Sequence, residues 1–143
     1  MPIKQKTKIV IDTNIFVASL FGDTSRKIID LWLSGEIQLC ISEPIVGEYM
    51  EILRRFMFKD EKMIARIKDA LERKDNACFI QRPEEKEWIH EDPEDNKFIA
   101  CALALNADYV ISTDSHLLKE PAWDGIRVIR PHEFILQNQN IPL

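Results

Sequence analysis

Short apolar runs rich in β-branched residues alternate with longer amphipathic stretches along the whole chain, and this alternation is the feature that most restricts the fold. The runs predict strands at residues 9–11, 37–41, 77–80, 109–111 and 127–129. The stretches between them predict helices at 14–20, 26–34, 44–56, 60–73, 92–105 and 132–136. Strands that alternate with helices favour a parallel sheet covered on both faces. The sequence therefore predicts an α/β protein, with a three-layer α/β/α arrangement and a central parallel sheet of four to five strands.

The predicted elements leave no internal repeat or linker, so the 143 residues are expected to form a single domain at 1–143. Residues 1–7 are expected to be a basic lead-in without the apolar core of a signal peptide, and residues 137–143 a loose tail. The helix pair at 44–73 departs from simple alternation and could extend from the domain as an arm. No apolar run approaches the length of a membrane span, so no membrane partner is expected.

Charge and cysteine content restrict the function classes further. The chain carries 24 acidic and 19 basic residues, and its net charge of −5 argues against general affinity for nucleic acid. Such a partner is not excluded, because carboxylates gathered around a cation count as negative in this sum. The cysteines, Cys40, Cys78 and Cys101, show no zinc-binding spacing and are expected to be small core residues in a reducing cytoplasm.

Acidic residues follow four of the predicted strands. Asp12 ends the first strand, and Glu48 lies in the first turns of the helix after the second. Asp95 opens the helix after the third strand, and Asp114 follows the fourth. The carboxyl ends of parallel strands form one edge of a sheet, where ligands bind in open α/β folds. We therefore expect the four carboxylates to converge at that edge.

Each acid also has a purely structural interpretation. Asp12 is placed to cap the helix that begins near residue 14, and Asp114 is placed to start a turn. Asp92 and Asp95 fit a helix-capping pattern around Pro93, and Glu48 is favoured by the helix dipole alone.

Four such acids at one edge would repel one another. Two carboxylates about 4 Å apart repel by on the order of 4 kcal/mol at an effective dielectric near 20. Either some of the acids are protonated or a divalent cation lies among them. Oxygen ligands without His or Cys select Mg²⁺ or Mn²⁺.

The segments around these acids resemble the motifs of PIN-domain nucleases. Residues 9–14, Ile-Val-Ile-Asp-Thr-Asn, are similar to the opening motif of the family, and residues 42–48 are similar to the second. Residues 92–102 resemble the third motif and residues 107–114 the fourth. The resemblance spans about residues 8–135. The subgroup it favours comprises the bacterial and archaeal toxin components of toxin–antitoxin pairs, of which VapC is the best-known type.

The resemblance implies a Mg²⁺- or Mn²⁺-dependent ribonuclease that hydrolyses phosphodiester bonds of single-stranded RNA. Asp12, Asp95 and Asp114 would hold the metal. Glu48 would orient or deprotonate the attacking water, or complete the metal shell. Asn14 would fix Asp12 or touch a phosphate oxygen.

Three further residues are expected near this site. Ser112 would support it with a hydroxyl, whereas Thr13 is expected to serve the turn rather than the chemistry. Members of the family often carry a second Asp two positions after the fourth acid, and this chain has His116 there. The imidazole would bind water or RNA or be structural, and the substitution puts a second metal position in doubt.

Candidate surfaces for substrate and partners lie near the end of the helix at 44–56. Arg54, Arg55 and Lys59 form the best local cluster of positive charge for an RNA strand, and a solvated charged face is an equally good interpretation. The toxin subgroup implies an antitoxin protein as partner and a homodimer. Residues 56–58, Phe-Met-Phe, are the candidate apolar contact surface.

Other functions remain compatible with the sequence. A haloacid-dehalogenase-like phosphatase also begins with a strand and an Asp, but it requires a second Asp two residues later, where this chain has Asn14. The fold could instead serve as a catalytically silent binding module, or as a housekeeping RNA-processing or DNA-flap nuclease. The chain is short for the clamp that a flap nuclease requires, so RNA is the expected substrate.

Overall fold

A six-stranded sheet organises the chain, and the computed structural model describes residues 6–138 around it. The strand order is β3-β2-β1-β4-β6-β5, and every neighbouring pair is parallel except β5 with β6. The strands are β1 (Lys8–Ile11), β2 (Gln38–Ser42), β3 (Ala77–Ile80), β4 (Tyr109–Ile111), β5 (Ala122–Trp123) and β6 (Ile126–Ile129). The helices are α1 (Thr13–Ser19), α2 (Asp23–Leu33), α3 (Glu43–Arg55), α4 (Glu61–Arg73), α5 (Asn96–Leu105) and α6 (Pro131–Gln137), with 3₁₀ turns η1 (Pro93–Asp95) and η2 (Leu117–Lys119).

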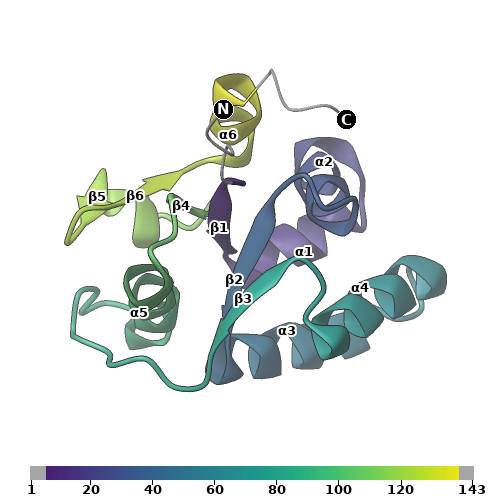
Figure 1. The fold of residues 1–143 in the computed structure, drawn as a ribbon, viewed down its shortest axis with the longest axis horizontal. Helices are drawn as coiled ribbons and strands as arrows, with labels where there is room; N and C mark the ends of the chain where they lie inside the picture. The colour runs from purple at the N-terminus through teal and green to yellow at the C-terminus, as the bar shows by residue number, and fades with distance from the viewer. Residues whose placement is uncertain (1–5, 139–143) are drawn as a thin grey trace, which may run out of the picture.

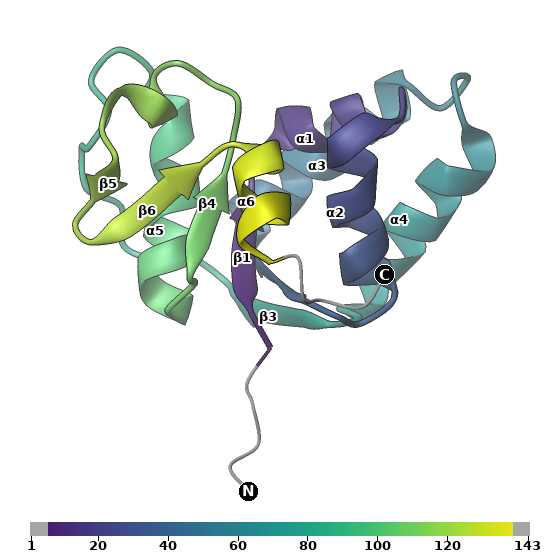
Figure 2. The ribbon, with the colours of Figure 1, turned by 90° about the horizontal axis from the view of Figure 1, so that it is seen from above.

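Helices cover both faces of this sheet. α5 packs against β1, β2, β3 and β4 on one face, while α2 and α6 contact each other on the opposite face (Figures 1 and 2). The predicted three-layer α/β/α architecture with a parallel sheet is therefore confirmed. The short antiparallel strand β5 was not predicted, because its two residues form no recognisable apolar run.

Apolar side chains on both faces of the central strands form the core. Ile9, Val10 and Ile11 of β1 have no exposed surface, as expected for a strand covered on both sides. The helix pair α3–α4 does not extend as an arm, because the apolar stripe of α4 is buried in the same core. The buried residues of this stripe are Met63, Ile64, Ile67, Ala70 and Leu71.

Capping residues set where the helices begin at the carboxyl ends of the strands. Asp12 follows β1 and caps α1, and its side chain accepts a hydrogen bond from the backbone N–H of Asn14. Ser42 ends β2 and caps α3, and its hydroxyl accepts a hydrogen bond from the backbone N–H of Ile45 at 3.5 Å. The first turns of α1 and α3 therefore project from the same edge of the sheet.

The remaining expectations for the chain concern its cysteines and its ends. Cys40 and Cys101 are buried, Cys78 is partly buried, and none of the three forms a disulfide. None of the helices within residues 6–138 combines the length and the apolarity that a bilayer crossing requires. Residues 1–5 of the expected lead-in and 139–143 of the expected tail lie outside the described residues.

Candidate active site

The four predicted acids line one pocket of about 320 Å³. Asp12 follows β1 directly, Glu48 lies in the second turn of α3, Asp95 ends η1, and Asp114 follows β4. β2, β1 and β4 are neighbours in the parallel part of the sheet, so the segments that follow them meet at one edge. The structure thus brings together four carboxyl groups that are far apart in the sequence.

Asp12 is buried, and both of its oxygens accept hydrogen bonds. Ser112 Oγ donates to Oδ2 at 2.7 Å, and the backbone N–H of Asn14 donates to Oδ1 at 3.4 Å. Burial raises the pKa of Asp12, the two donors lower it, and the charges of Asp114 and Glu48 raise it further. Ser112 and the main chain of Asn14 therefore orient this carboxyl group, while the Asn14 side chain is exposed at the pocket.

Asp95 is buried, and its Oδ2 has no hydrogen-bond partner among the described residues. Burial, followed by the charges of Asp114, Asp12 and Asp92, raises the pKa of Asp95 to about 8. A buried acceptor without a partner destabilises a fold unless another group satisfies it. An oxygen in this condition, beside other carboxyl groups, is suited to coordinate a cation.

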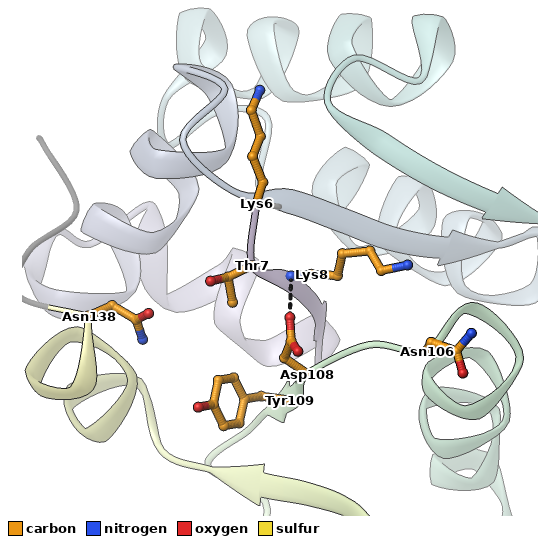
Figure 3. A pocket seen from close by; sticks show the side chains of 7 residues that line it. All are labelled: Lys6, Thr7, Lys8, Asn106, Asp108, Tyr109 and Asn138. Carbon is orange, nitrogen blue, oxygen red and sulfur yellow. Dashed lines mark hydrogen bonds between the residues drawn. The ribbon is translucent and has the colours of Figure 1, made fainter. Parts of the chain in front are cut away.

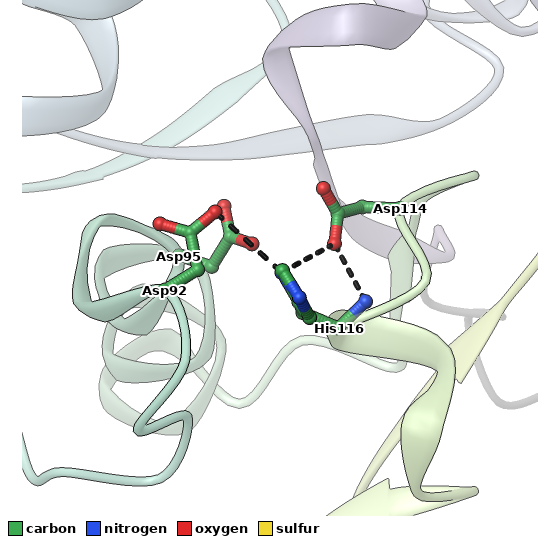
Figure 4. Close-up of side chains that lie close together, drawn as sticks. All are labelled: Asp92, Asp95, Asp114 and His116. Carbon is green, nitrogen blue, oxygen red and sulfur yellow. Dashed lines mark hydrogen bonds and ion pairs between the residues drawn. The ribbon is translucent and has the colours of Figure 1, made fainter.

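Asp114 and His116 lie in the loop after β4 and face Asp92 and Asp95 (Figure 4). Asp114 Oδ1 accepts a hydrogen bond from the backbone N–H of His116 at 2.7 Å, and the Asp114 N–H donates to Ser112 Oγ at 2.9 Å. His116 Nδ1 lies 3.8 Å from Asp114 Oδ1 and 3.8 Å from Asp92 Oδ2. One ligand atom from each of the four residues lies within 4.8 Å of the other three.

Asp92 belongs to this cluster, although its sequence position indicated a helix cap. It does precede Pro93 at the start of η1, but its side chain forms no capping hydrogen bond. The side chain lies beside His116 and Asp95 instead. The interpretation of Asp92 as a helix cap was therefore wrong, because its side chain contacts His116 and Asp95 instead of the backbone N–H groups of the next helical turn.

Glu48 is held through both carboxylate oxygens. Thr13 Oγ1 donates a short hydrogen bond to Oε1, and Lys97 Nζ forms a close ion pair with Oε2. Thr13, which was expected to serve the turn rather than the chemistry, therefore also contacts the site. The sequence did not indicate that Lys97 belongs to the site, because a lysine in the first turn of a helix is ordinarily a surface residue. Its position two residues after Asp95 was the one feature that pointed to the site.

The predicted basic cluster does not act as one group at the pocket. Arg55 lines the pocket and forms an ion pair with Glu51 at 2.8 Å. Arg54 is exposed, and Lys59 Nζ lies 4.9 Å from the centre of the Phe21 ring. Neither Arg54 nor Lys59 is among the residues that line the pocket.

A larger pocket of about 420 Å³ lies at the opposite end of the sheet (Figure 3). Its one carboxylate, Asp108, accepts a hydrogen bond from the backbone N–H of Lys8 at 2.8 Å. The side chains of Lys6 and Lys8, which also line it, extend in different directions (Figure 3). This pocket gathers no set of acids, so the smaller pocket is the candidate active site.

The donor set of the acidic pocket fits a hard divalent ion. Carboxylate oxygens dominate it, one buried oxygen of Asp95 has no partner, and the acids repel one another. Mg²⁺ and Mn²⁺ prefer such oxygen ligands. Asp92, Asp95, Asp114 and His116 are the residues whose ligand atoms lie closest together, and Asp12, whose two oxygens already accept hydrogen bonds, lines the same pocket.

Comparison with known proteins adds a family and a fold. A sequence-family model of the PIN domain matches residues 8–116. The fold is similar to that in a crystal structure of VapBC2 from Rickettsia felis bound to a DNA fragment from their promoter. This match has a TM-score of 0.56 and 13% sequence identity, and it covers 87% of this chain and 98% of the other. No curated protein matches the sequence.

Proposed function

The chain belongs to the PIN-domain family, and on this premise we propose that it is a Mg²⁺- or Mn²⁺-dependent ribonuclease that hydrolyses phosphodiester bonds of single-stranded RNA. The observation that carries the proposal is the meeting of Asp12, Glu48, Asp95 and Asp114 in one pocket. The buried Oδ2 of Asp95, which lacks a partner among residues 6–138, supports a cation there.

Asp12, Asp95 and Asp114 would hold the metal ion in this proposal, and Asp92 would adjoin it. When bound, such an ion activates a water molecule as nucleophile at neutral pH and offsets the negative charge of the phosphate in the transition state. Ser112 keeps Asp12 oriented through its 2.7 Å hydrogen bond, and the backbone N–H of His116 does the same for Asp114.

Glu48 would orient the attacking water or accept its proton. Thr13 and Lys97 hold the Glu48 carboxylate in one position, and a fixed acceptor is what positioning of a water molecule requires. Arg55 at the pocket would contact the phosphate backbone of the RNA, with Arg54 and Lys59 extending this contact along the end of α3.

The biological role that fits this chemistry is the toxin of a toxin–antitoxin pair in the cytoplasm. The similarity of the fold to a chain of a VapBC2 structure supports this role, and an antitoxin protein would then be the partner. A homodimer is proposed as the assembly, because apolar side chains at Phe21, Met57 and Phe58 are exposed on the surface. A housekeeping RNA-processing nuclease would use the same site.

Cleavage assays with an Asp12→Asn variant test the proposed activity. Cleavage of single-stranded RNA by the wild type in Mg²⁺ or Mn²⁺ is expected to fall below detection in the variant, because one metal ligand is lost. The Tm of the metal-free protein is expected to be unchanged or raised, since one of several repelling charges is gone. Retained cleavage by the variant would reject the assignment.

A catalytically silent binding module is the second candidate, and one observation favours it. With a pKa of about 8, Asp95 binds a proton at neutral pH, so the acids can coexist without an ion. Thermal melting with increasing Mn²⁺ separates the two candidates. The nuclease is expected to gain about 2.7 kcal/mol of stability at a Mn²⁺ concentration 100 times the Kd, whereas a module without a metal site gains nothing.

A further inference from the structure

Lys97 is a buried cation that contacts the acidic pocket without lining it. Only 9% of its side chain is exposed. Its Nζ contacts Glu48 Oε2, donates to the backbone carbonyl of Glu94 at 2.7 Å, and lies 3.5 Å from Glu94 Oε2. Lysine is rarely buried unless it is paired, and here the ammonium group pairs with oxygens of Glu48 and Glu94, both of which line the pocket, and lies 5.2 Å from the centre of the Phe98 ring.

The position of Lys97 in its helix opposes the local electrostatic preference. It is the second residue of α5, where the positive end of the helix dipole disfavours a cation. Departures from a local rule of this kind are common where a tertiary contact or a function requires the residue. The ion pair with Glu48, which is 49 positions earlier in the chain, is the tertiary contact in this case.

The pairing divides the acids of the pocket into two groups. Glu48 has both oxygens satisfied by side chains of this chain, Thr13 on one and Lys97 on the other. In contrast, no Lys or Arg within the described residues forms an ion pair with Asp12, Asp92, Asp95 or Asp114. His116 Nδ1, 3.8 Å from Asp92 Oδ2 and from Asp114 Oδ1, is the basic group that faces the aspartates. The acids without a lysine or arginine partner are therefore the aspartates.

From this division we propose, building on the metal dependence proposed above, that Lys97 is a resident cation that neutralises Glu48 and limits the pocket to one divalent ion. The ammonium group stands where a second ion would otherwise be needed to compensate Glu48. The single ion is held by the aspartates, and Glu48 is not one of its ligands. Lys97 is thus a positioning residue for Glu48, and it determines how many metal ions bind.

Isothermal titration of the metal-free protein with MnCl₂ tests the proposal through stoichiometry, without reference to cleavage. The wild type is expected to bind one Mn²⁺ per chain. Lys97→Met keeps the length of the side chain but removes its charge, and it is expected to bind a second Mn²⁺ at Glu48. Lys97→Arg keeps the charge and is expected to restore a stoichiometry of one. Lys62→Met, at an exposed position of α4, is the matched control and is expected to match the wild type.

Glu48→Gln gives a second test if Lys97→Met does not fold. This variant is expected to bind one Mn²⁺ more weakly than the wild type, because the freed ammonium group then repels the ion. Loss of all Mn²⁺ binding in Glu48→Gln would make Glu48 a metal ligand and overturn the proposal.

The titrations also separate failure of this proposal from failure of the metal dependence. Two Mn²⁺ ions in the wild type, or a single ion in a folded Lys97→Met variant, would overturn the role of Lys97 and leave a metal-dependent nuclease. A wild type that binds no Mn²⁺ would contradict the metal dependence itself.

Discussion

A carboxyl group that is buried beside other carboxyl groups holds its proton at unusually high pH, and Asp95 is in this position. Its folded-state pKa of about 8 compares with an ordinary value of 3.8. At neutral pH the proton on Asp95 removes one negative charge from the pocket, and Lys97 compensates another at Glu48. The proton on Asp95 and the ammonium group of Lys97 together allow five acids to lie close to one another in the pocket. These acids are Asp12, Glu48, Asp92, Asp95 and Asp114.

The stability of the metal-free protein is therefore expected to decrease as the pH rises from about 4 to about 8. The folded state binds the Asp95 proton more tightly than the unfolded state, so this contribution is fully present below pH 4 and is lost as the pH approaches 8. Asp12, whose pKa is also raised, acts in the same direction. Thermal melting in EDTA between pH 5 and pH 8.5 measures the effect, and a change of ~1 kcal/mol corresponds to about 3 °C.

An Asp95→Asn variant is the matched control for this pH dependence. It lacks the titrating group but keeps the size of the side chain, so its Tm is expected to vary less with pH and to exceed that of the wild type at pH 8. Asp30→Asn, which changes an exposed carboxylate paired with the partly buried Arg26 outside the pocket, is expected to show the same pH dependence as the wild type. An Asp95→Asn variant that melts below the wild type at pH 8 in EDTA would contradict the expected repulsion.

At the scale of secondary structure, one face of α3 forms a wall of the pocket. Glu48, Glu51, Ile52 and Arg55 line it, and their spacing of three and four residues places them on one side of the helix. Arg54 lies outside this face and is exposed. The helix thus directs one of the two neighbouring arginines to the site.

Removal of these arginines is expected to weaken RNA binding and to reduce its dependence on salt. Each phosphate contact on a single strand contributes about 0.7 to the slope of log K against log salt concentration. We expect Arg55→Ala to lower the slope by about 0.7, and the Arg54→Ala/Arg55→Ala double variant to lower it by at most about 1.4. Fluorescence anisotropy with a labelled RNA, in the Asp12→Asn background to prevent cleavage, measures both slopes.

Arg73→Ala is the control for this series, because Arg73 lies at the far end of α4 and pairs with Asp69 and Asp75. It is expected to leave the slope unchanged. Equal slopes for the wild type and the double variant would identify the charged end of α3 as a solvated surface.

At the scale of the whole molecule, apolar side chains from two separate loops lie at one surface. Phe21 is 62% exposed and Phe58 is 86% exposed, while the Phe21 and Phe56 rings lie edge to face with their centres 6.5 Å apart. We call Phe21, Phe56, Met57 and Phe58 the phenylalanine patch. Exposed large apolar groups that cluster in this way mark contact surfaces.

A Phe58→Asp variant is expected to weaken the proposed homodimer without loss of stability, because the ring is almost fully exposed within the chain. Sedimentation velocity over a range of concentrations measures the change from dimer to monomer. Leu136→Asp, on the exposed side of α6, is the control and is expected to remain dimeric. The same molecular mass for the wild type and Phe58→Asp at every concentration would exclude the patch as the dimer contact.

The positions of Asp12, Asp95 and Asp114 could be predicted because they depend on chain order. Asp12 and Asp114 follow strands closely, and Asp95 opens the helical segment after β3, so parallel strands place all three at a common edge. Ser112 was also accessible to prediction, since it lies two residues before Asp114 at the end of β4. The pairing of Lys97 with Glu48 could not be predicted, because nothing near Lys97 in the sequence distinguishes it from a surface lysine.

Alternation of strand and helix signals in the amino-acid sequence was enough to establish the α/β architecture and the edge at which the acids meet. These features depend on local hydrophobic periodicity and on chain order, which the sequence contains directly. Three contacts could be known only from the tertiary structure: Lys97 pairs with Glu48, Asp92 lies beside His116, and the Phe21 ring packs against Phe56. Such contacts depend on the distances and directions of side chains from distant segments, and these are established only when the helices pack on the sheet.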